Sequence, residues 1–60
     1  MLVGDFCNLY IESSESVAIY SHDEERNVFH GTYNEAYFSE YADEEICSFG
    51  IEDGIICINI

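Results

Sequence analysis

Positive charge is almost missing from this sequence of 60 residues. It has one arginine, Arg26, and no lysine, against thirteen Asp and Glu, so its formal net charge is −12. Proteins that bind DNA, RNA or anionic lipid surfaces place several Lys and Arg side chains against phosphates. One arginine cannot supply such a patch, so the composition excludes nucleic acids and membrane surfaces as direct ligands.

Long apolar runs are missing as well, and so is a paired set of cysteines. No run approaches the roughly 20 apolar residues that span a bilayer, and residues 1–15 lack the basic start and apolar stretch of a secretory signal. The three cysteines, Cys7, Cys47 and Cys57, are odd in number and form no CxxC pair. We therefore expect a protein of the reducing cytoplasm, with its cysteines buried as small apolar residues.

Proline is absent, whereas 48% of the residues are apolar, including five Tyr and four Phe. Disordered acidic segments lack this apolar and aromatic content. A chain this short has room for one domain. We therefore expect one small acidic domain over residues 1–60.

The first half of the chain predicts a helix and a hairpin. Apolar residues at helical spacing favour a helix over residues 2–11, although the same segment can also be drawn as a strand. Residues 16–21 and 28–30 are rich in β-forming side chains and flank the polar stretch 22–27. These two strands are expected to pair as a hairpin with a longer loop.

A capping box marks the start of a second helix. Thr32 and Glu35 have the spacing at which each side chain bonds the other residue's backbone N–H, although Asn34 is an alternative cap. The predicted helix covers residues 33–42. It aligns Tyr33, Tyr37 and Tyr41 in one stripe.

The final segment carries the clearest signal. Asp53-Gly54 between two apolar runs is typical of a two-residue type I′ hairpin turn. That turn predicts pairing of Glu52 with Ile55 and of Phe49 with Ile58. One face of the hairpin is then wholly apolar: Cys47, Phe49, Ile51, Ile56, Ile58 and Ile60.

These elements give the order α-β-β-α-β-β. The predicted fold class is α+β, with a four-stranded antiparallel sheet and two short helices on one face. In this topology, six carboxylates gather at one end of the sheet: Asp23, Glu24, Glu25, Asp43, Glu44 and Glu45. Because so much charge of one sign destabilises a small domain, we interpret this end as a partner-binding surface. Tyr37 and Tyr41 are candidate anchors for the partner.

The other face of the hairpin suggests an alternative. Ile55 and Cys57 are expected on the uncovered outer face of the sheet, where they predict self-association into a homodimer. No catalytic residue, metal site or cofactor is expected. His22 and His30 do not have zinc-ligand spacing with the cysteines, and the serines at 13, 14 and 16 have no evident His partner.

The C-terminal half resembles a known group of proteins. Val28-Phe29-His30-Gly31, a short helix containing Glu, and Ser48-Phe49-Gly50-Ile51-Glu52-Asp53-Gly54 followed by Ile55-Ile56-Cys57-Ile58-Asn59-Ile60 resemble the ending of small acidic uncharacterised proteins in phages and prophages of Firmicutes. In composition alone, the chain is also similar to anti-CRISPR proteins and other DNA mimics. The resemblance implies a bacterial cytoplasm and, as partner, a basic nucleic-acid-binding protein such as a nuclease or defence effector. The expected function is that of an inhibitor; the alternative is a homodimeric assembly module.

Overall fold

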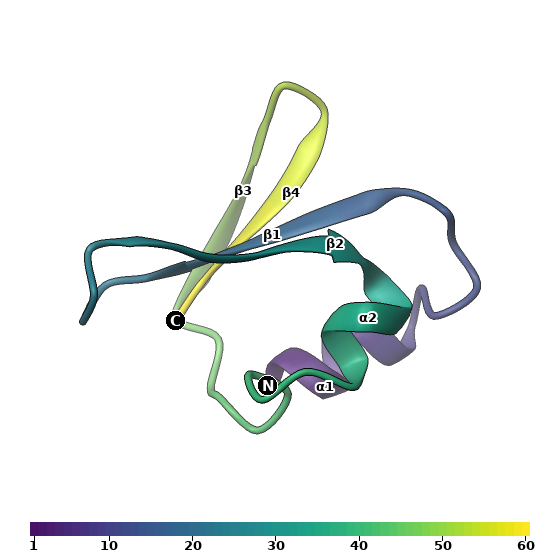
Figure 1. Cartoon of the computed structure of the whole chain (residues 1–60), viewed down its shortest axis with the longest axis horizontal. Helices are drawn as coiled ribbons and strands as arrows, with labels where there is room; N and C mark the ends of the chain where they lie inside the picture. The colour runs from purple at the N-terminus through teal and green to yellow at the C-terminus, as the bar shows by residue number, and fades with distance from the viewer.

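A computed structural model describes all residues, 1–60 (Figure 1). The element order is the predicted one. The helices are α1 (Val3–Asn8) and α2 (Tyr33–Tyr37), and the strands are β1 (Ser16–Ser21), β2 (Arg26–Thr32), β3 (Ser48–Glu52) and β4 (Ile55–Asn59). The four strands form one sheet and the two helices lie together on one side of it, so the α+β prediction is confirmed. Neither helix is long and apolar enough to cross a membrane.

The sequence predicted a wholly antiparallel sheet, but one pair of strands is parallel. The strand order is β2-β1-β4-β3, and the two central strands, β1 and β4, run parallel, with Val17 beside Ile56 and Tyr20 beside Asn59. Both hairpins are antiparallel. The two hairpins therefore meet at β1 and β4, and this is the one parallel pair of the sheet.

The β3–β4 hairpin has the predicted register. Glu52 pairs with Ile55, Ile51 with Ile56 and Phe49 with Ile58. Asp53 and Gly54 in the turn both have positive φ, 53° and 78°. A type I′ turn requires this backbone conformation at both central positions, and Gly adopts it without a steric penalty.

The β1–β2 hairpin is longer than expected. β1 has the predicted bounds, whereas β2 extends on both sides of the predicted 28–30 and leaves a loop of residues 22–25. A bulge where Ile19 pairs with Phe29 and Tyr20 with Asn27 leaves Val28 as the extra residue on β2. Such a bulge increases the local twist, and the two hairpins cross at a marked angle in Figure 1.

Both helices are shorter than the sequence pattern indicated. Residues 2–11 do form a helix rather than a strand, but α1 ends at Asn8 because Leu9 and Tyr10 bond the carbonyls three residues back, at 3.1 Å each. This tighter spacing is the 3₁₀ geometry common at helix ends. Leu9 and Tyr10, two of the apolar residues in this segment, lie beyond the helix and are exposed.

The capping box of α2 is present as predicted. The Thr32 backbone N–H donates to Glu35 Oε1 at 2.9 Å, and the Glu35 N–H donates to Thr32 Oγ1 at 3.2 Å, so Thr32 and not Asn34 is the cap. The helix ends at Tyr37 rather than at residue 42. Ser39 Oγ donates to the Ala36 carbonyl at 2.7 Å and accepts from the Tyr41 N–H at 3.2 Å, which replaces the next helical turn. Acidic residues beyond this point also oppose the helix dipole.

The core lies between the helices and the two central strands, β1 and β4. Its largest fully buried side chains are Ile19, Ile58, Val3, Val17 and Cys7. The helices do not extend beneath the end of the β3–β4 hairpin, which projects beyond them (Figure 1). The apolar face predicted for this hairpin is therefore only partly covered: Ile58 is buried, but Phe49 is 54% exposed and Ile51 75% exposed.

The cysteines are all free, and only Cys7 is buried, whereas Cys47 is exposed and Cys57 is half-buried. The expectation that all three are buried was thus wrong for Cys47, and Cys57 meets it only in part. Cys47 lies directly before β3, where its N–H donates to the Asn59 carbonyl at 2.8 Å.

Candidate partner-binding surfaces

An acidic hollow lies at the end of the sheet where the β1–β2 loop approaches the loop after α2. Its volume is about 320 Å³. The residues that line it are Ser21, Asp23, Glu24, Glu40, Tyr41, Glu44 and Ile60. We call this site, with its four carboxylates, the acidic hollow.

Backbone contacts bring these residues together from three parts of the chain. Ile60 is held against the end of β1, because its N–H donates to the Tyr20 carbonyl at 2.9 Å and its carbonyl accepts from the His22 N–H at 3.0 Å. The Glu24 N–H donates to Ser21 Oγ at 3.2 Å, which shapes the β1–β2 loop. Across the hollow, the Glu44 carbonyl accepts from the Val3 N–H at 2.9 Å. The hollow is therefore a product of the folded chain and not of one local acidic run.

The charge of the hollow is poorly compensated. Arg26, the one basic side chain, lies with its Nη2 2.7 Å from Glu24 Oε1, and both side chains are largely exposed. No basic side chain pairs with the other three carboxylates. Partial burial raises the pKa of the Tyr41 hydroxyl, and the nearby carboxylates of Glu40 and Glu24 raise it further. Tyr41 therefore stays neutral and can donate a hydrogen bond beside the carboxylates.

The six predicted acids do not all meet at this site. Asp23, Glu24 and Glu44 line the hollow, whereas Glu25 and Asp43 are exposed and do not line it. Glu45 lies 3.1 Å from the Met1 ammonium, an exposed pair. The six residues therefore divide into three that line the hollow and three that do not.

The tyrosine anchors divide in the same way. Tyr41 lines the hollow, whereas Tyr37 is half-buried against the core and packs edge-on to Phe38, with ring centroids 5.0 Å apart. Glu40, which sequence reasoning left out of the cluster, is part of the lining. Placing it required knowing that α2 ends at Tyr37, and Ser39, a helix-terminating side chain, was the available signal.

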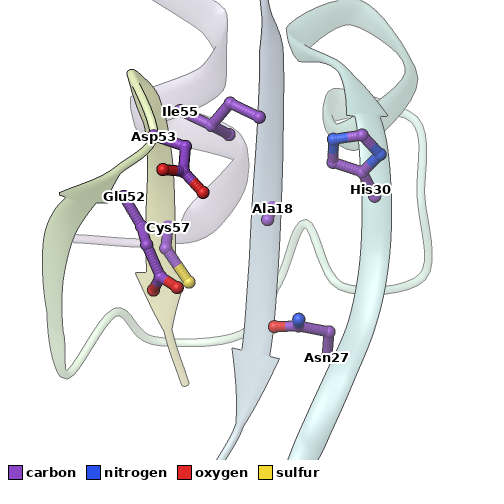
Figure 2. Close-up of a pocket in the computed structure, with 7 residues that line it drawn as sticks. All are labelled: Ala18, Asn27, His30, Glu52, Asp53, Ile55 and Cys57. Carbon is purple, nitrogen blue, oxygen red and sulfur yellow. The ribbon is translucent and has the colours of Figure 1, made fainter.

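A second hollow, of about 220 Å³, lies on the outer face of the sheet, opposite the helices. Figure 2 shows its lining residues, which are Ala18, Asn27, His30, Glu52, Asp53, Ile55 and Cys57. In the sheet register Ala18 lies between His30 on β2 and Cys57 on β4. The short Ala18 side chain forms the floor of this outer hollow.

The outer hollow does not assemble a reactive group. His30 and Cys57 lie two strands apart, which separates their backbones by about 10 Å at ordinary strand spacing. A nucleophile and its base need hydrogen-bond distance. No three His, Cys, Asp or Glu side chains are grouped to hold a metal ion. Ile55 and Cys57, predicted on this face, are both half-buried there.

Comparisons with protein-family models, with curated proteins and with solved structures found no match for this chain. A proposal about its function therefore depends on its own residues and their geometry.

Proposed function

We propose that this protein is an acidic inhibitor that occupies the basic nucleic-acid-binding surface of a host defence or nucleic-acid-handling protein, in the cytoplasm of a bacterial host. It acts by binding and not as an enzyme, and it needs no cofactor. The observation that carries the proposal is the acidic hollow, where Asp23, Glu40 and Glu44 have no basic partner.

The chemistry of the hollow suits a partner that normally binds phosphates. Arg and Lys side chains that contact phosphate oxygens also pair with carboxylates, and Arg does so with two parallel hydrogen bonds. A net charge of −12 attracts such a surface over long range and speeds association at low salt. Tyr41, an amphipathic ring among the carboxylates, adds contact area of the kind that often dominates binding energy.

The test is displacement of DNA from purified bacterial nucleases and repressors with basic DNA-binding grooves. A fluorescein-labelled duplex is bound to each protein, and its release is followed by anisotropy as the inhibitor is added, at low and high salt. The proposal expects release by the inhibitor from at least one member of this panel, weakening steeply as salt rises.

Two matched variants separate the hollow from the net charge. The first variant combines Glu40→Gln with Glu44→Gln, and the second combines Glu12→Gln with Glu15→Gln. Both remove the same charge from exposed side chains, but only the first changes the hollow. We expect the first variant to lose about tenfold or more in potency and the second much less. Equal losses, or no displacement from any member of the panel, would contradict the proposal.

The outer hollow favours a second candidate function, a homodimeric assembly module that buries Ile55 and Cys57. Its support is an uncovered sheet face on which Ile55 and Cys57 lie near the short Ala18 side chain. Light scattering over a range of concentrations tests this alternative. A dimer that Ile55→Glu dissociates supports it, and a monomer at millimolar concentration removes it.

A further inference from the structure

We propose that the free edge of β3 binds an extended segment of a partner protein as a fifth strand, and that this segment alternates apolar with basic residues. β3 is the last strand in the order β2-β1-β4-β3, so one of its sides has no neighbour. All five of its residues are exposed. This surface is separate from the acidic hollow, and the inference stands whether or not the hollow binds its proposed partner.

The backbone of β3 is arranged for pairing. In an antiparallel pair, hydrogen-bonded and non-bonded residue pairs alternate, and the pair that closes a two-residue turn is a bonded one. Glu52 with Ile55 closes the turn, so Ile51 and Phe49 belong to non-bonded pairs and their N–H and C=O groups point away from β4. Residues 48–52 make no backbone hydrogen bond outside the sheet. The edge therefore offers two donors and two acceptors at the spacing of a strand.

The edge also lacks the usual protection. Natural edge strands are shielded by Lys, Pro, bulges or a covering loop, whereas Ser48-Phe49-Gly50-Ile51-Glu52 has no Lys or Pro and pairs with β4 in unbroken register. Its inward-facing side chains are apolar and exposed, at 54% for Phe49 and 75% for Ile51. The Phe49 ring lies 5.2 Å from that of Phe6 between centroids, so the apolar strip continues onto α1.

Side-chain alternation specifies the chemistry of the added strand. On the inner face, its side chains lie beside Phe49 and Ile51 and should be apolar. On the outer face, its side chains lie beside Ser48, Gly50 and Glu52, with Asp53 at the adjoining turn. The carboxylates at this end and the net charge of −12 favour Lys or Arg in the outer positions.

Charge argues against a second copy of this chain as the occupant. An antiparallel copy centred on Gly50 would place Glu52 and Asp53 beside residues 47–48 of the other copy, two residues from its exposed Glu45. Two chains of −12 would then meet with carboxylates near each other at both ends, which is unfavourable. A basic and apolar strand meets no such repulsion.

The probe is a dye-labelled seven-residue peptide, Lys-Val-Lys-Val-Lys-Val-Lys, titrated with the intact protein. Two control peptides are used: one with Glu in place of Lys, and one with N-methyl groups on the backbone amides that would pair with β3. Anisotropy gives the affinity, and amide NMR shifts locate the site. We expect binding of the Lys peptide alone, with the largest shifts in residues 48–52.

Two protein variants with the same charge change make the test specific. Ile51→Lys places a charge on the edge, and Leu9→Lys replaces another exposed apolar residue, on the segment after α1; the wild-type side chains are 75% and 69% exposed, so both variants should fold. We expect Ile51→Lys to weaken peptide binding about tenfold and Leu9→Lys less than about twofold.

Other outcomes overturn the inference. Equal weakening by the two variants, unchanged binding of the N-methylated peptide, no binding of the Lys peptide, or a protein dimer that Ile51→Lys dissociates would each do so. The Glu40→Gln with Glu44→Gln variant should keep peptide binding while it loses DNA displacement, which distinguishes failure at the edge from failure at the acidic hollow.

Discussion

Ile58 and Ile51 lie on the same face of one hairpin, yet we expect their side chains to contribute very differently to the free energy of unfolding. Ile58 is fully buried, whereas Ile51 is 75% exposed. Replacing each with Val deletes one methylene and keeps a β-branched side chain with the same strand preference. For a fully buried Ile this change costs about 0.5 to 1.5 kcal/mol, and we expect Ile58→Val near the upper end. Ile51→Val removes little buried surface and should stay within about 0.5 kcal/mol.

Urea unfolding followed by circular dichroism measures the difference. A domain of this length has roughly 3 to 9 kcal/mol of stability, so a loss of about 1 kcal/mol is readily seen. At a slope near 1 kcal/mol per molar urea, Ile58→Val should lower the midpoint by about 1 M and Ile51→Val by less than half as much. Equal shifts at the two positions would refute the assignment of an uncovered hairpin face. The measurement is repeated at two protein concentrations, since burial of Ile51 between copies would make its effect concentration-dependent.

Three further outcomes are expected. Gly54→Ala should destabilise the hairpin by about 1 kcal/mol, because the φ of 78° at Gly54 is unfavourable for Ala. Gly50→Ala should not, because Gly50 has no positive φ. Neither site is crowded by neighbouring atoms, so the urea midpoints of the two variants compare the backbone effect alone. The Thr32 hydrogen bonds lower the pKa of Glu35 below its ordinary 4.5, so their contribution is present at neutral pH and lost as pH falls through the lowered pKa; an NMR titration should give a midpoint below 4.5 that Thr32→Ala moves upward. Added salt should raise the urea midpoint at pH 7 by screening the net charge of −12, and a fall in the midpoint would contradict this.

Local signals predicted the fold best where a few residues decide the backbone. Asp53 and Gly54 set a turn with positive φ at both positions, and the register of β3 and β4 followed from it. Thr32 and Glu35 likewise determined where α2 begins. In both cases the interaction is completed within four residues, so no tertiary contact is needed to predict it.

The contacts between elements were less predictable. Nothing local specifies that β4 lies beside β1, because that choice depends on how the two hairpins share the apolar surface of α1 and α2. The apolar pattern of Phe49 and Ile51 predicted which face they share but not whether the helices would cover it. Coverage depended on helix length, and α1 ends three residues and α2 five residues before the predicted end.

The sequence predicted acids at one end of the sheet, though not a hollow there, because the topology determines which loops share that end. Of the residues proposed from the sequence, Asp23, Glu24, Glu44 and Tyr41 lie around one hollow in the structure. Glu40 was not among the predicted residues, and three of those predicted do not line the hollow: Glu25, Asp43 and Glu45. Glu40, Asp43 and Glu45 belong to the segment after Tyr37, where turns replace the predicted helix.

The parallel pairing of the two central strands has a consequence for how the chain folds. Val17 and Ile56 are neighbours in space but 39 positions apart in the sequence. Ile19 and Ile58 share the core only after the intervening hairpin, helix and loops have closed into a single long loop. Chains dominated by such distant contacts fold more slowly than helical chains of equal length. Each hairpin is local and can form early, so the step that sets the folding rate should be the docking of one hairpin against the other.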